Sequence, residues 1–84
     1  MVRTTFSGQV IVTVLRKFRY RPVSWAGCHV RLRHEDPETG EVRFVDVPMH
    51  DEVALGTLKD VAEQCGADNF HDWCRWIDAQ DRPG

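Results

Sequence analysis

The chain has 84 residues, of which 42% are hydrophobic and 29% charged, and its formal net charge is −2. This balance excludes a disordered chain and predicts one globular domain over residues 1–84. No apolar run approaches the roughly 20 residues that cross a bilayer, and the first residues lack the apolar core of a signal peptide. We therefore expect a cytoplasmic protein without a membrane partner.

The charges are distributed unevenly along the chain. Residues 1–34 carry seven basic side chains and no acid, whereas residues 35–84 carry all 13 acids against four bases. If the fold keeps the two halves apart, one face attracts anions and the other repels them. The odd number of cysteines, Cys28, Cys65 and Cys74, shows no disulfide framework and favours reduced, mostly buried thiols.

The first element in chain order is predicted as a β-strand. Residues 4–20 are rich in Val, Ile, Thr and aromatic residues and largely alternate in polarity. Along such a strand Phe18 and Tyr20 face the core, and the basic residues between them face solvent. The segment 21–27, with a proline and a glycine, is then predicted as a connection.

Two further strands and a tight turn follow. Residues 28–35 alternate clearly, the sequence DPETG at 36–40 is a strong turn signal, and residues 41–47 alternate again. If Asp36 pairs with Glu41, apolar residues lie opposite apolar residues, and the basic Arg31 lies opposite the acidic Asp46. The register puts Val30 opposite Val47 and Leu32 opposite Val45.

Two helices complete the chain. Thr57 begins a capping-box-like sequence, although this helix could start near Asp51, and Gly66 is a good residue to end it. A second helix from residue 68 or 69 carries an apolar stripe at Phe70, Trp73, Cys74 and Ile77. The predicted fold class is α+β: a three-stranded antiparallel meander followed by two short helices packed on one face.

The basic residues of the strands are the first candidate binding surface. This basic strand face would consist of Lys17, Arg19, Arg21, Arg31 and Arg33. Such a patch suits a phosphate backbone, but single-strand binders of the sheet type also place aromatic residues on the same face, which this pattern does not. A solvated strand face without a ligand is the alternative.

The tryptophans and the acids of the last helix are the second candidate. Asp68, Asp72 and Trp76 would form an acidic and aromatic helical face that suits a basic protein partner, and Trp25 would be a loop anchor. The alternative is that Trp25 and Trp76 only cap a thin core. The acids also argue against a DNA-reading helix-turn-helix.

The sequence shows no recognised catalytic or metal motif. It has no nucleophile elbow, glycine-rich phosphate loop, C-x-x-C or H-x-x-x-H pair. His71 and Cys74 are adjacent on a helix, and Cys28 and His29 could approach other ligands, yet four converging ligands are not indicated. We therefore expect no enzyme activity, no cofactor and no metal.

The composition favours an interaction module. The main hypothesis is a non-enzymatic regulator or inhibitor that binds a protein or ribonucleoprotein complex, of the kind that phages or mobile elements encode against host complexes. One alternative is a nucleic-acid binder that uses the basic strand face. Another is a small accessory subunit of a larger assembly, and the chain could be a monomer or a homodimer.

Overall fold

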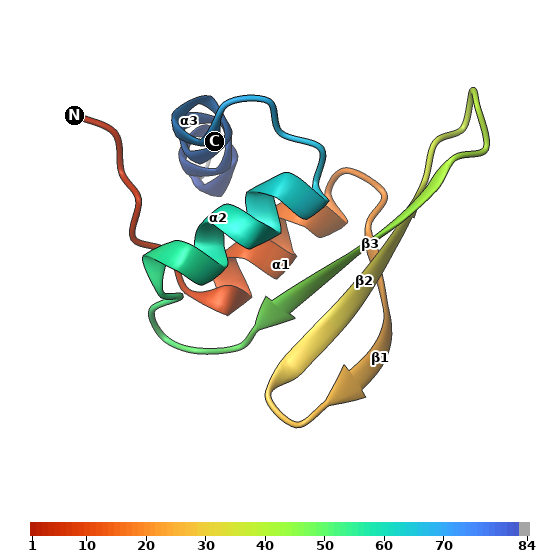
Figure 1. Cartoon of the computed structure of the whole chain (residues 1–84), viewed down its shortest axis with the longest axis horizontal. Helices are drawn as coiled ribbons and strands as arrows, with labels where there is room; N and C mark the ends of the chain where they lie inside the picture. The colour runs from red at the N-terminus through yellow and green to blue at the C-terminus, as the bar shows by residue number, and fades with distance from the viewer. Residues whose placement is uncertain (83–84) are drawn as a thin grey trace.

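Helices flank a three-stranded sheet in chain order. The computed structural model describes residues 1–82, with α1 (Gly8–Arg16), β1 (Arg21–Ala26), β2 (His29–Glu35), β3 (Val42–Pro48), α2 (Leu55–Gln64) and α3 (Phe70–Asp81). The strands form an antiparallel meander in the order β1-β2-β3 (Figure 1). The α+β class, with a meander followed by two helices, is confirmed.

The N-terminal segment is a helix, and its prediction as the first strand was wrong. The Ser7 hydroxyl accepts a hydrogen bond of 3.1 Å from the Val10 amide and caps α1. Ile11, Val14 and Leu15 are fully buried, which is helical spacing. Burial of this helical face outweighs the β propensity of the Val and Ile residues, because propensity is a weak prior.

The segment predicted as a connection is instead strand β1. Pro22 is tolerated because β1 lies at the edge of the sheet, where one side of the backbone needs no ladder partner. The register between β1 and β2 shifts between Pro22 and Ser24, which marks a bulge. Tyr20 is buried as expected, but Phe18 is 37% exposed and packs against Trp76 at a ring separation of 4.8 Å.

The predicted hairpin register is confirmed. Val30 pairs with Val47, Leu32 with Val45 and Arg31 with Asp46. The Asp36 amide donates to the Glu41 carbonyl at 2.8 Å, and the Asp36 carboxylate accepts from the Glu38 amide. The turn chemistry and the alternating pattern therefore agree on one pairing.

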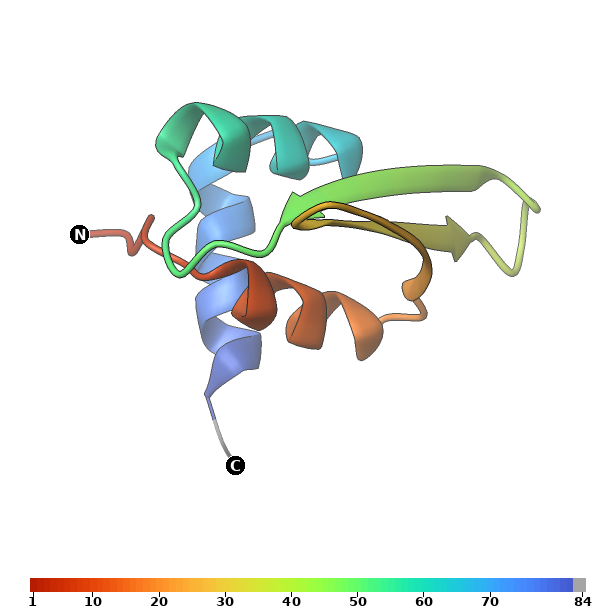
Figure 2. The same ribbon diagram turned by 90° about the horizontal axis from the view of Figure 1, so that it is seen from below.

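The core lies between the sheet and the helices. The inner sheet face is made of Val30, Leu32, Val45 and Val47, which are fully buried, and α1 and α2 cover it while α3 crosses behind them (Figure 2). The outer sheet face exposes Arg31 and Phe44 to solvent, and the Arg31 guanidinium lies 4.9 Å above the Phe44 ring centre.

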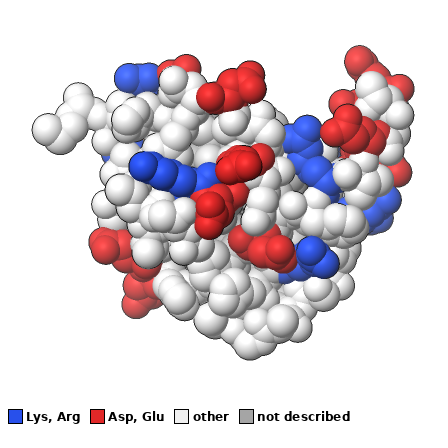
Figure 3. Space-filling model, viewed as in Figure 1, with Lys and Arg blue, Asp and Glu red and all other residues white. Residues whose placement is uncertain are grey.

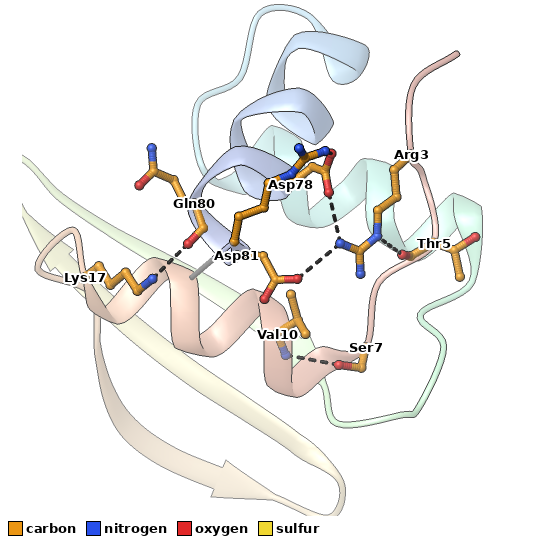
Figure 4. A network of polar contacts seen from close by, with 9 residues as sticks. Arg3, Thr5, Ser7, Val10, Lys17, Asp78, Gln80 and Asp81 are labelled. Carbon is orange, nitrogen blue, oxygen red and sulfur yellow. Dashed lines mark hydrogen bonds and ion pairs between the residues drawn. The ribbon is translucent and has the colours of Figure 1, made fainter. Parts of the chain in front are cut away.

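Helix α3 adds a further layer against α1. Asn69 caps it by accepting from the Asp72 amide, and the predicted stripe is buried at Trp73, Cys74 and Ile77. The N-terminal segment is tied to its last turns, because Arg3 bonds both Asp78 and Asp81 at 3.1 Å (Figure 4). These contacts join the two ends of the chain.

The Arg3 network predicts an acid-sensitive contribution to stability. The hydrogen bond from Arg3, followed by that from Arg82, holds the pKa of Asp78 below its usual value. A depressed folded-state pKa stabilises the fold above the unfolded pKa of about 4, and this contribution is lost as pH falls through the folded value. The R3M variant should therefore have a lower urea midpoint at pH 7, with a smaller difference at pH 2.

The control for this measurement is R16M, which removes an exposed arginine of α1 outside the network. We expect the urea midpoint of R16M to equal that of the unmodified protein at both pH values. An R3M deficit that is equally large at pH 2 and pH 7 would show that the pairing with Asp78 is not its cause.

Candidate functional site

The predicted basic strand face comes together only in part. Lys17 follows the end of α1 and donates to the Gln80 carbonyl at 2.8 Å, Arg19 lies in a turn with φ 70°, and Arg21 opens β1. Arg31 and Arg33 share the outer face of β2, and Arg21 pairs with Arg33 across the sheet. Lys17 and Arg19 do not join this face, because the segment that carries them is the end of a helix and a turn.

The expected separation of charge is also absent. Basic side chains of the first half pair with acids of the second half, as in Arg3 with Asp78, Arg31 with Asp46 at 3.2 Å and Arg33 with Glu35 at 3.5 Å. Figure 3 accordingly shows red and blue groups side by side. In the same view the surface at the end of the molecule that carries the β1–β2 turn is white.

The predicted helical face does come together. Asp68, Asp72 and Trp76 line one hollow of about 340 Å³, with Trp73 at its base. Its role in binding a partner stays a prediction. Trp25, the predicted loop anchor, is in β1 rather than a loop and is 66% exposed.

Two exposed histidines converge near the β1–β2 turn. His29 opens β2, and His50 follows the end of β3 by two residues. The sheet register places His29 beside Pro48, and the Met49 amide donates to the Cys28 carbonyl at 2.7 Å. Their ring centres are therefore 6.4 Å apart in an edge-on arrangement. We had not predicted this pair.

The loop that carries His50 rests on the first turn of α1. The Gly8 amide donates to the His50 carbonyl at 2.9 Å. A side chain at Gly8 would have its Cβ only 2.1 Å from the Pro48 carbonyl oxygen, so glycine is the residue that allows this approach. Helix α1 therefore fixes the backbone position of His50.

A groove is lined by Met49, the residue before His50, although neither histidine lines it. It has a volume of about 580 Å³ and runs between α1 and β1, with Trp25, Met49, Arg16 and Lys17 among its lining residues. On the outer sheet face a smaller hollow of about 140 Å³ contains His29, Arg31 and Ser24. An imidazole can accept or donate a proton, and Arg31 beside His29 can contact a phosphate, so the histidine pair suits acid–base chemistry on a phosphodiester.

The fold is that of a small α+β protein with an exposed histidine pair at one end of its sheet. Residues 8–67, which are 60 of the 84 residues, match the HicA toxin family of bacterial toxin–antitoxin systems. The chain belongs to that family. The match covers α1, the sheet and α2, and α3 lies beyond it. Searches among curated proteins and among solved structures gave no match.

The family membership corrects the predicted function. HicA toxins are ribonucleases that cleave mRNA, so the predictions of a non-enzymatic module and of a regulator or inhibitor were wrong. The sequence has none of the catalytic motifs that have a fixed spacing, and the two histidines come together only in the fold. A cognate protein partner was predicted, and HicA toxins bind cognate HicB antitoxins.

Within residues 1–82, no helix has the length and apolar character needed to cross a membrane. No group of three or more His, Cys, Asp or Glu side chains in the same range has the geometry of a metal site.

Proposed function

We propose that this chain is the mRNA-cleaving toxin of a toxin–antitoxin pair, and that His29 and His50 are its catalytic acid and base. The observation that carries the proposal is the convergence of the two exposed rings, whose centres are 6.4 Å apart, inside the segment shared with the family. This separation allows both rings to reach one phosphodiester.

The chemistry uses the 2′-hydroxyl of RNA. One neutral imidazole takes the proton of the 2′-hydroxyl, and the 2′-oxygen attacks phosphorus. The other imidazole, protonated, gives its proton to the departing 5′-oxygen. The products are a 2′,3′-cyclic phosphate and a 5′-hydroxyl. Positioned general acids and bases typically contribute about 10²- to 10⁴-fold to a rate.

The groove between α1 and β1, which is lined by Met49, the residue before His50, is the proposed path of the RNA strand. Arg16 and Lys17 lie on one side of it and can contact phosphates, while the exposed Trp25 ring offers a stacking surface for a base. Stacking does not require a particular base, so this path predicts cleavage in single-stranded regions of varied sequence.

We further propose that the protein partner is a cognate antitoxin and that the chain acts in the cytoplasm, where mRNA is found. This rests on the family's pairing of toxin and antitoxin. The acidic and aromatic hollow at Asp72 and Trp76 is the proposed contact for a basic segment of that partner.

The test is the chemistry of the cleaved ends. Purified protein is incubated with a synthetic single-stranded RNA, and the fragments are identified by mass spectrometry. We expect internal cleavage with 2′,3′-cyclic phosphate and 5′-hydroxyl ends. A matched RNA with 2′-O-methyl groups should remain intact, because its 2′-oxygen has no proton to lose.

Two results would contradict the proposal. Cleavage of the 2′-O-methyl RNA would exclude attack by the 2′-oxygen and with it the assigned histidine roles. Intact RNA in both reactions, from protein shown to be folded by circular dichroism, would exclude the ribonuclease activity itself.

A further inference from the structure

A thiol lies against both proposed catalytic rings. Cys28 is in the β1–β2 turn directly before His29, and its side chain is exposed. The Cys28 Sγ is 3.4 Å from His50 Nε2 and 3.7 Å from His29 Nδ1. The three side chains come from two separate parts of the chain, and they form one cluster that solvent reaches. We assign the thiol no part in RNA cleavage.

The surroundings favour reaction at this thiol over the other two. Thiolates are the reactive form of cysteine, and an imidazole in contact with the sulfur can accept the proton that the thiol loses as it reacts. Cys74 is fully buried. Burial raises the pKa of the Cys65 thiol to about 11, so Cys65 remains protonated at neutral pH. Cys28 combines exposure with two imidazole neighbours, and neither of the other cysteines does.

We propose that Cys28 is a redox modification site through which peroxides switch off the adjacent ribonuclease site. The inference rests on the proposed function, because it assigns regulation to the same histidines. Its physical basis is the contact of one exposed sulfur with both rings.

The reaction has two steps with balanced electrons. The Cys28 thiolate attacks one oxygen of hydrogen peroxide, the O–O bond breaks, and hydroxide leaves and takes a proton to become water. Sulfur loses two electrons and becomes a sulfenic acid, while the peroxide is reduced. A small thiol such as glutathione then forms a mixed disulfide with loss of water, and excess thiol reverses it by exchange.

Either product changes the site sterically and chemically. The added oxygen or the glutathionyl group has to lie next to Nε2 of His50 and Nδ1 of His29, since the sulfur already contacts both nitrogens. The new group competes with the RNA for the same space and for hydrogen bonds to the same rings. Oxidation should therefore block cleavage without unfolding the domain.

The experiment treats the full chain with hydrogen peroxide and follows two readouts. Dimedone labelling with mass spectrometry reports sulfenic acid at each cysteine, and a labelled RNA reports cleavage. We expect labelling of Cys28 about tenfold or more above Cys65 and Cys74. RNA cleavage should fall by about tenfold or more, return with dithiothreitol, and be unaffected by peroxide in C28S.

A third measurement separates this inference from the proposed function. The rate of alkylation of Cys28 by iodoacetamide needs no RNA, and it should fall in H50Q but not in H71Q, where an exposed histidine of α3 is changed. If the protein cleaves no RNA, this rate and the dimedone pattern still test the thiol. Equal labelling of all three cysteines, or unchanged cleavage by protein oxidised at Cys28, would overturn the inference.

Discussion

The H29Q variant is expected to cleave RNA about 10²- to 10⁴-fold more slowly than the unmodified protein, because glutamine cannot exchange protons near neutral pH. Glutamine is polar and close in size to histidine, and His29 is exposed, so the fold should be unchanged. The measurement is a single-turnover rate on a labelled single-stranded RNA. Bacteria that express the unmodified protein should stop growing, and bacteria that express H29Q should continue to grow.

The matched control is H71Q, since His71 is also exposed but lies on α3, beyond the residues shared with the family. Its rate should equal that of the unmodified protein. H50Q should lose activity as H29Q does, and the double variant should be little worse than either, as expected of residues that act as a unit. An H29Q rate similar to the H71Q rate would contradict the assignment.

The sheet was predictable because its signals are local. The turn sequence at 36–40 and the alternation on both sides of it fix one register, and the structure has that register. The histidine pair could have been predicted from the same register. If Val30 faces Val47, then His29 faces Pro48, and the two residues after Pro48 must pass close to Cys28. Carrying the register two positions further would have placed His50 beside His29.

The first helix was not predictable from β propensity alone. Val10, Ile11 and Val12 are β-branched neighbours, yet the polar positions Gln9, Thr13 and the following Arg16 recur at helical spacing. Ser7 before them is also a good helix cap. Predicting a strand instead of this helix also led to the wrong candidate site. A strand at 4–20 would place basic residues on a sheet face, whereas the helix forms one wall of a groove and supports the backbone of His50.

Replacing Gly8 by alanine is expected to impair both stability and catalysis through that support. The new Cβ would lie 2.1 Å from the Pro48 carbonyl oxygen and 2.8 Å from the Met49 Cα, which are backbone atoms that cannot rotate away. Overpacking of this kind costs about 1–3 kcal/mol of unfolding free energy. Because the displaced segment carries His50, a shift of about 1 Å should slow RNA cleavage by up to about 10²-fold.

The control is G56A, the same substitution in α2 at a site where a Cβ would have no neighbour within 4 Å. Alanine in a helix stabilises relative to glycine by about 0.5–1 kcal/mol, so G56A should have a slightly higher urea midpoint and an unchanged cleavage rate. Both rates are to be measured at a temperature where circular dichroism shows the variants folded. If G8A matched G56A in rate and midpoint, helix α1 would not be what positions His50, and the histidine pair would have to be held by the sheet register alone.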